Sequence, residues 1–128
     1  MVYTEPKKYR LLIVDDDNDV TTTFMAGLSM YGFIVSAFND PKKALQSFEA
    51  GTYDLLVLDI RMPLMNGFEL YQELERIDNK PKVCFITAFT FYYESLKEFF
   101  PTKKMYCFIK KPIQVRDLAN QLTTELNK

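Results

Sequence analysis

The fold is decided by the stretch YDLLVLDIRMPLMNG, residues 53–67. Its four apolar residues at 55–58 run directly into an acid, Asp59. A short apolar run between turn residues is typical of a strand buried on both faces, as in a parallel sheet. Pro63 ends regular structure, and Asn66-Gly67 is a turn signal before a helical pattern. The stretch therefore predicts a buried strand, a loop and the start of a helix.

Asp59 is expected at the carboxyl end of this strand, where open α/β sheets bind their ligands. A carboxylate in that place costs free energy unless another group neutralises it. The neutralising residues must come from elsewhere in the chain.

The same kind of apolar run occurs four more times, and helical periodicity follows each run. The predicted strands are 10–14, 33–38, 55–58, 82–86 and 105–109, and the helical patterns lie near 20–28, 41–48, 68–77, 91–100 and 115–126. Strands that alternate with helices predict an α/β fold, a (βα)5 doubly wound five-stranded parallel sheet with helices on both faces. The expected strand order is 2-1-3-4-5, which flavodoxin and CheY share.

Composition limits the classes of function. The chain has 128 residues, of which 48% are hydrophobic and 26% are charged, as in soluble globular proteins. The net charge of −1 gives no basic surface for nucleic acid. No apolar run approaches a membrane span, and the N-terminus is not signal-like. We expect a cytoplasmic protein without a nucleic-acid or membrane partner, with a tail at 1–8 and one domain at 9–128.

The two cysteines, Cys84 and Cys107, lie inside strand-like runs, and the chain has no histidine. Two thiols without further nitrogen or sulfur ligands make a zinc site improbable. We expect free thiols that serve only as packing residues.

Polar residues stand where four of the predicted strands end. They are Asp15, Asp16, Asp59, Thr87 and Lys111. Because the carboxyl ends of parallel strands share one edge of the sheet, these side chains should converge. Clustered carboxylates repel one another and recruit a cation, and this donor set suits Mg²⁺. A carboxylate can also act as a nucleophile and form an aspartyl phosphate, whose oxygens the metal, the lysine and the hydroxyl would bind.

Over nearly its whole length, the sequence resembles a response-regulator receiver domain of two-component signalling systems. The resemblance rests on VDDD at 14–17, LDIRMPLMNG at 58–67, TA at 87–88 and KP at 111–112. Each motif is weak alone, but the four in order at the expected strand ends are specific.

The resemblance implies a role for each site residue. Asp59 would be the phosphoacceptor, and Asp16, Asp59 and the backbone carbonyl of Arg61 would bind Mg²⁺. Asp15 would act indirectly or through water. Thr87 would be the switch hydroxyl, and Lys111 would bind the phosphoryl group before a cis Pro112.

The resemblance also implies partners and an output. A histidine kinase or phosphotransfer protein would supply the phosphoryl group. Phe108, three residues before Lys111, would be the switch aromatic, although it lacks the hydroxyl that many family members have there. An unknown target would bind the face formed by the fourth helix, fifth strand and fifth helix, and the protein would be a monomer or a phosphorylation-dependent dimer. The domain would assist only its own phosphorylation and dephosphorylation, as a switch and not an enzyme.

Other functions fit the sequence less well. A calcium loop over 15–26 would need a glycine and a bidentate acid where Val20 and Ala26 stand. A phosphohydrolase with an aspartate nucleophile would need a second acid where Arg61 stands. A flavodoxin-type carrier would place an anion against the acids at 15–19. A receiver-like scaffold that is never phosphorylated would not need all five site residues.

Overall fold

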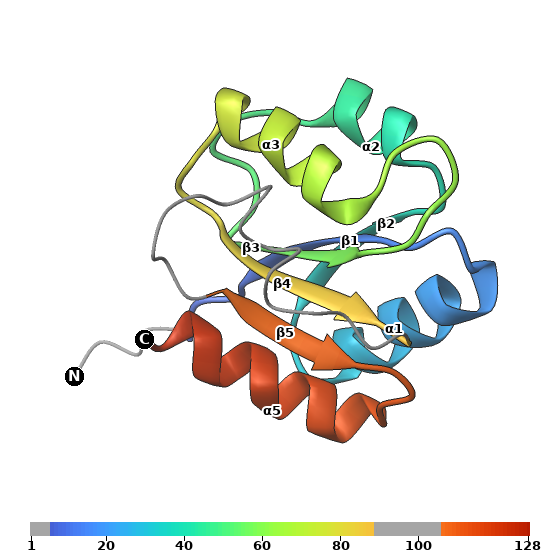
Figure 1. Cartoon of the computed structure of the whole chain (residues 1–128). Helices are drawn as coiled ribbons and strands as arrows, with labels where there is room; N and C mark the ends of the chain where they lie inside the picture. The colour runs from blue at the N-terminus through green and yellow to red at the C-terminus, as the bar shows by residue number, and fades with distance from the viewer. Residues whose placement is uncertain (1–5, 89–105) are drawn as a thin grey trace.

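In the computed structural model, which describes residues 6–88 and 106–128, each of the five apolar runs forms a strand. The strands are β1 (Arg10–Val14), β2 (Ile34–Phe38), β3 (Leu55–Asp59), β4 (Lys82–Thr87) and β5 (Cys107–Lys110). They form one sheet in the order β2-β1-β3-β4-β5, and all four neighbouring pairs are parallel (Figure 1). The predicted fold class and strand order are confirmed.

Two layers of helices cover the sheet. Helices α2 (Pro41–Ser47) and α3 (Gly67–Ile77) lie on one face, and α1 (Asn18–Met30) and α5 (Val115–Leu126) lie on the other (Figure 1). The helix expected near 91–100 falls outside the described residues, as does the first residue expected for the fifth strand, Met105.

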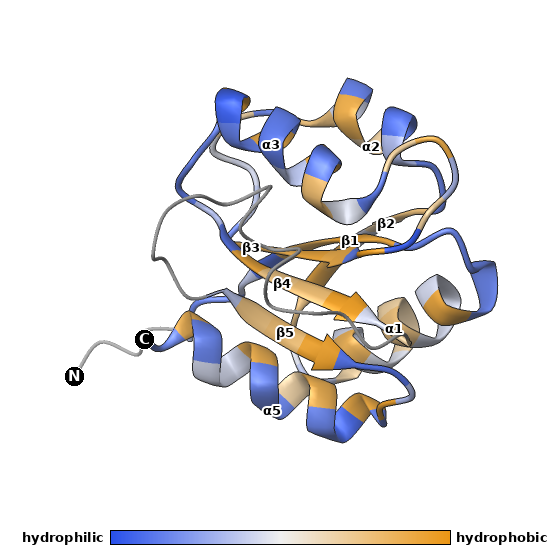
Figure 2. Cartoon of the chain, viewed as in Figure 1, coloured by the Kyte–Doolittle hydropathy of each residue, from blue (hydrophilic) through white to orange (hydrophobic). Residues whose placement is uncertain are grey.

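Successive side chains of a strand point to opposite faces, so each central strand supplies both cores. Leu12 and Leu58 pack in the core beneath α2 and α3, whereas Leu11 and Val57 pack in the core beneath α1 and α5. The middle of each central strand is therefore apolar on both faces, and Figure 2 shows these stretches mainly in orange. This explains why the sequence has unbroken apolar runs and no alternation.

Polar side chains fix the helix starts nearest the site. The side chain of Asp17 accepts hydrogen bonds from two backbone N–H groups of α1. Asn66 and Glu69 form a reciprocal capping box at the start of α3, with distances of 2.8 and 3.0 Å. Such caps satisfy N–H groups that have no partner within the helix. They hold the two loops that follow β1 and β3.

Cys84 and Cys107 form a disulfide between β4 and β5, so the prediction of free packing thiols is wrong. The two residues are direct partners in the parallel register, and their Cα atoms lie 4.4 Å apart. That register brings together residues that are 23 positions apart in the sequence. The sequence shows two cysteines in strands but does not show that they face each other.

None of the helices in the two described segments is long and apolar enough to cross a membrane. The chain enters the sheet near Tyr9, whose carbonyl accepts a hydrogen bond from Ile34 at 2.9 Å. The division into a tail at 1–8 and a domain at 9–128 stays a prediction.

Gly67, the first residue of α3, lies directly against the backbone of β3. Its N–H donates to the carbonyl of Ile60 at 3.0 Å, and an added Cβ would collide with the carbonyl of Asp59. We expect Gly67→Ala to lower the free energy of unfolding by about 1–3 kcal/mol, the usual effect of overpacking. Urea denaturation measures this.

Gly27→Ala is the matched control, because the three atoms nearest to its added Cβ all belong to the side chain of Val115. A side chain can move more easily than backbone, so the loss should be smaller. Equal stability of Gly67→Ala and the unmodified protein would contradict the expectation.

Candidate functional site

Three carboxylates meet at the carboxyl edge of the sheet. Asp15 and Asp16 follow β1, and Asp59 ends the neighbouring strand β3. One carboxylate oxygen from each lies within 4.8 Å of the others. Asp15 and Asp59 are buried, with exposed fractions of 1% and 4%, whereas Asp16 is exposed. The structure therefore brings together the three acids that the sequence singled out.

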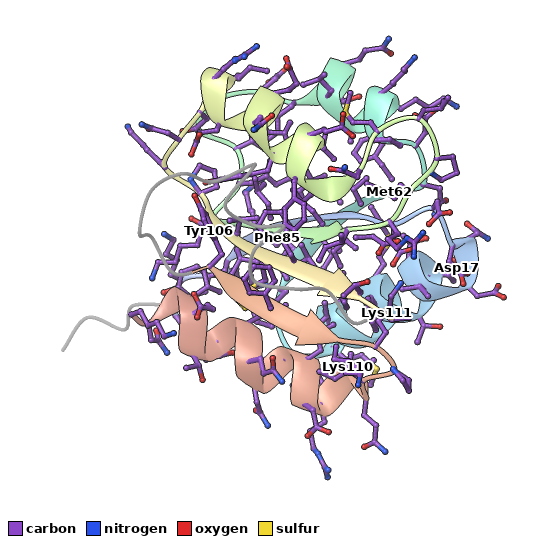
Figure 3. All side chains as sticks on the ribbon, in the orientation of Figure 1. Asp17, Met62, Phe85, Tyr106, Lys110 and Lys111 are labelled. Atoms are coloured by element: carbon purple, nitrogen blue, oxygen red, sulfur yellow. A yellow bond between two sulfur atoms is a disulfide. The ribbon has the colours of Figure 1, made fainter. Side chains whose placement is uncertain are left out.

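A lysine from the far end of the chain reaches this acidic cluster. The Nζ atom of Lys111 donates to Oδ2 of Asp15 at 2.8 Å and lies 3.8 Å from Oδ2 of Asp59. Figure 3 shows it at the edge of the sheet beyond the tip of β5. The adjacent Lys110 is exposed, so Lys111 is the lysine that enters the site. Its direct hydrogen bond goes to Asp15 rather than to the predicted acceptor.

The electrostatics of the site follow from burial and from these neighbours. Burial, and then the charge of Asp15, raise the pKa of Asp59 to about 7, although Lys111 acts in the opposite direction. Partial burial alone would lower the pKa of Lys111, but the hydrogen bond and charge of Asp15 and the charges of the other two acids outweigh it. The net result is a raised pKa for Lys111. The lysine is thus held as a cation.

The remaining predicted site residues lie around Asp59. Thr87 ends the adjacent strand β4 with only 3% of its surface exposed, and its carbonyl accepts from the N–H of Lys111 at 2.8 Å. The N–H of Arg61 donates to Oδ1 of Asp59 at 3.4 Å. The Lys111–Pro112 peptide bond is cis, as the resemblance implied.

Phe108 lies on β5, three residues before Lys111, and is partly buried. Its ring stacks on that of Phe85 on β4, with centroids 5.7 Å apart and planes at 25°. Phe108 therefore links β5 to β4 by ring packing in the core beneath α2 and α3.

Two residues that sequence reasoning missed hold the acidic loop. Nδ2 of Asn39 donates to the backbone carbonyl of Asp15 at 2.9 Å and to Oγ1 of Thr21 at 2.8 Å. The Thr21 hydroxyl in turn donates to the carbonyl of Asn18 at 3.1 Å. One signal was available: Asn39 directly follows a predicted strand, as the predicted site residues do. The periodicity of the sequence does not place Asn39 at the site. Its place there follows from the strand order, in which β2 is the neighbour of β1.

The donor set fits Mg²⁺. Carboxylates are the hard oxygen ligands that this ion binds, usually one or two of them with several waters. Asp15 is already engaged by Lys111 and by the N–H of Asp17 at 2.9 Å, which agrees with an indirect role. The exposed Asp16 faces solvent, where coordinated water can be accommodated.

The model of the response regulator receiver domain matches residues 11–123. The chain belongs to this family. Members of the family act in two-component signalling as phosphoaccepting switches, and this chain has that role.

Individual relatives agree. The receiver protein CpdR of Brucella abortus is 31% identical over 113 residues, which cover 88% of this chain and 92% of CpdR. The transcriptional regulatory protein PrrA of Mycobacterium tuberculosis is 39% identical over 79 residues. That match covers 62% of this chain and only 34% of PrrA, so it spans about a third of the longer regulator.

Solved structures show the same fold. A CheY-like receiver domain from Methanospirillum hungatei superimposes with a TM-score of 0.82 at 26% identity, covering 94% of this chain and 95% of the other. The HemR receiver domain from Leptospira biflexa gives a TM-score of 0.81 at 26% identity, covering 94% of this chain and 96% of the other.

The raised pKa of Asp59 predicts a pH-dependent stability in metal-free protein. Between its unfolded value near 4 and its folded value near 7, the folded state binds the extra proton, so stability falls as pH rises by at most about 1.4 kcal/mol per pH unit. Asp59→Asn removes this effect. The variant should be the more stable protein at about pH 8, and the difference should shrink as pH falls through this window.

Urea denaturation with a chelator present measures this difference. Adding Mg²⁺ should reduce the advantage of the variant, because the ion stabilises only the protein that binds it. A difference that stays constant with pH would contradict the raised pKa.

Asn39 and Thr21 are expected to matter for metal affinity, because their hydrogen bonds hold the backbone of the loop that carries the acids. Asn39→Ala and Thr21→Val should weaken Mg²⁺ binding by roughly 10-fold to 100-fold, the usual cost of losing an orienting hydrogen bond behind a ligand. Isothermal titration calorimetry measures the affinity. Asn120→Ala, an exposed asparagine on α5, is the matched control and should leave the affinity unchanged. Equal affinities in all four proteins would contradict a positioning role.

Proposed function

We propose that Asp59 is the phosphoacceptor and that it receives the phosphoryl group from a histidine kinase or a phosphotransfer protein. The observation that carries this proposal is the buried carboxylate of Asp59 at a strand end, beside a second buried acid and a lysine that contacts both. Burial of two like charges has no structural benefit that a neutral residue would not give. A chemical role explains the arrangement.

The Mg²⁺ ligands in this proposal are the carboxylates of Asp16 and Asp59 and the backbone carbonyl of Arg61, with Asp15 acting indirectly. The ion would neutralise charge on the phosphoryl oxygens. An oxygen of Asp59 attacks phosphorus, and the bond between phosphorus and the donor atom breaks. Because the pKa of Asp59 is near 7 without metal, a cation in the site would also keep this oxygen deprotonated.

Lys111 and Thr87 are proposed to bind the transferred group. The ammonium of Lys111 lies 3.8 Å from Oδ2 of Asp59, close to the space that a phosphoryl oxygen would occupy. Thr87 ends the strand next to Asp59, and its hydroxyl can donate to a second oxygen. These positions supply charge and orientation, which are the main needs of phosphoryl transfer.

The switch in this proposal passes from Thr87 to β5. A phosphoryl group adds about −1.5 to −2 charge by analogy with other phosphorylated residues. New bonds to Thr87 and Lys111 would pull on the ends of β4 and β5, and Phe108 would change its packing on Phe85. The proposed output face is built from the fourth helix, β5 and α5, and its first part lies outside the described residues.

A separate enzyme activity is not part of this proposal. The domain would assist only its own phosphorylation and dephosphorylation, because Arg61 stands where a hydrolase of this type needs an acid. We place the protein in the cytoplasm, where histidine kinases phosphorylate their regulators, as a monomer or a phosphorylation-dependent dimer.

Acetyl phosphate tests the acceptor directly. After incubation with acetyl phosphate and Mg²⁺, intact-mass spectrometry should show one added phosphoryl group on the unmodified protein and none on Asp59→Asn. Lys111→Gln should be phosphorylated more slowly, because a cation near the attacking oxygen is lost.

Asp54→Asn is the matched control, since this acid lies at the opposite end of β3 and should leave phosphorylation unchanged. A phosphoryl group on Asp59→Asn would show that the acceptor is wrong. Failure of both proteins to react, with Mg²⁺ bound, would favour a scaffold that is never phosphorylated.

A further inference from the structure

The Cys84–Cys107 disulfide lies one position away from the aromatic stack on the same two strands. The register pairs Cys84 with Cys107 and, next to them, Phe85 with Phe108. The sulfur atoms face the core beneath α1 and α5, and the two rings face the core beneath α2 and α3. A covalent bond and a ring stack therefore join β4 to β5 on opposite faces of the sheet.

The two cysteine residues differ in their exposure to solvent. Cys84 is fully buried, whereas Cys107 is partly exposed. Cys107 also lines a cavity of about 260 Å³, together with Tyr71, Tyr106 and Lys82. Figure 3 shows Tyr106 on this side of the molecule, beside the start of β5 and away from Lys111. Among the described residues, the cavity thus borders Cys107 but not Cys84.

We propose that this disulfide is a thiol–disulfide exchange site at which a dithiol enters through the cavity and attacks Cys107. The pair lies outside the acceptor site, so the proposal does not depend on phosphorylation of Asp59.

The exchange conserves atoms and electrons. One thiolate of the dithiol attacks Sγ of Cys107, the bond between the cysteines breaks, and Cys84 leaves as a thiolate that takes up a proton. The second thiol of the reductant then displaces Cys107 and closes a disulfide within the reductant. Two electrons and two protons pass from the dithiol to the cysteines. A carboxylate oxygen of Glu125 lies within 4.8 Å of both sulfurs, where it can relay the proton to buried Cys84.

Opening the disulfide would loosen β5. In the described sheet this strand has one neighbour, β4, and it is only four residues long. Its noncovalent links to β4 are the ladder hydrogen bonds and the packing of rings such as Phe85 and Phe108. Phe108 lies on β5, and Lys111 directly follows this strand. The redox state of the cysteine pair would therefore affect the positions of the residues proposed for switching.

Accessibility is tested with single-cysteine variants and an aromatic disulfide, 5,5′-dithiobis(2-nitrobenzoate). Cys107 in Cys84→Ser should react roughly ten-fold or more faster than Cys84 in Cys107→Ser, because exchange follows access to the sulfur. Circular dichroism checks that both variants are folded. If one is not, peptide mapping of the unmodified protein, trapped as a mixed disulfide, identifies the attacked sulfur. Equal rates, or an adduct on Cys84, would overturn the proposal.

Opening is tested by hydrogen exchange in the Asp59→Asn background, which excludes any effect of phosphorylation. Dithiothreitol should open the disulfide without unfolding the protein, as alkylation and intact mass report. Amide exchange in β5 should then become several-fold faster, since local opening requires less free energy. The double variant Cys84→Ser/Cys107→Ser should show the fast exchange with or without dithiothreitol. Reduction only at the rate of global unfolding, or unchanged exchange in β5, would contradict the proposal.

Discussion

The functional edge of this sheet depends on one interaction, the contact of two buried carboxylates with a single lysine. Asp15 and Asp59 end adjacent strands, so their charges are close together where solvent screens them poorly. Lys111 lies between them, with Nζ at 2.8 and 3.8 Å from their oxygens. One cation does not balance the full charge of this group, which includes the exposed Asp16. Burial, and after it the charge of Asp15, raises the pKa of Asp59. The excess negative charge makes the site receptive to a metal cation.

The acids are held in fixed positions because the neighbouring loops contact the backbone at the ends of β1 and β3. Gly67 brings the start of α3 against the carbonyl of Asp59, where a side chain would collide. The capping box of Asn66 and Glu69 fixes the same loop. On the other side, Asn39 ties the end of β2 to the carbonyl of Asp15. The acids are therefore held by neighbours that take no part in the chemistry, which is how a site keeps like charges together in the absence of its cation.

Strand β5 connects this edge to the remainder of the fold. Its carboxyl end leads to Lys111, its middle carries the ring that stacks on Phe85, and its first residue forms the disulfide with β4. These contacts lie on both faces of one short strand. A change at any of them can shift the others, because they share a backbone of four residues.

The sequence by itself predicted the fold class and the strand order, because unbroken apolar runs alternate with helical patterns. It indicated the family through the resemblance of the motifs at 14–17, 58–67, 87–88 and 111–112. It also identified the acids that converge, since parallel strands place their carboxyl ends together. Only the tertiary structure decided that Lys111 donates its hydrogen bond to Asp15 rather than to Asp59. It also decided that Asn39 and Thr21 hold the acidic loop and that the two cysteines form a disulfide. Each of these depends on strand neighbours and register, which bring together residues 18 to 96 positions apart. A hydrophobic pattern specifies which residues are buried, but it does not specify which of them are in contact.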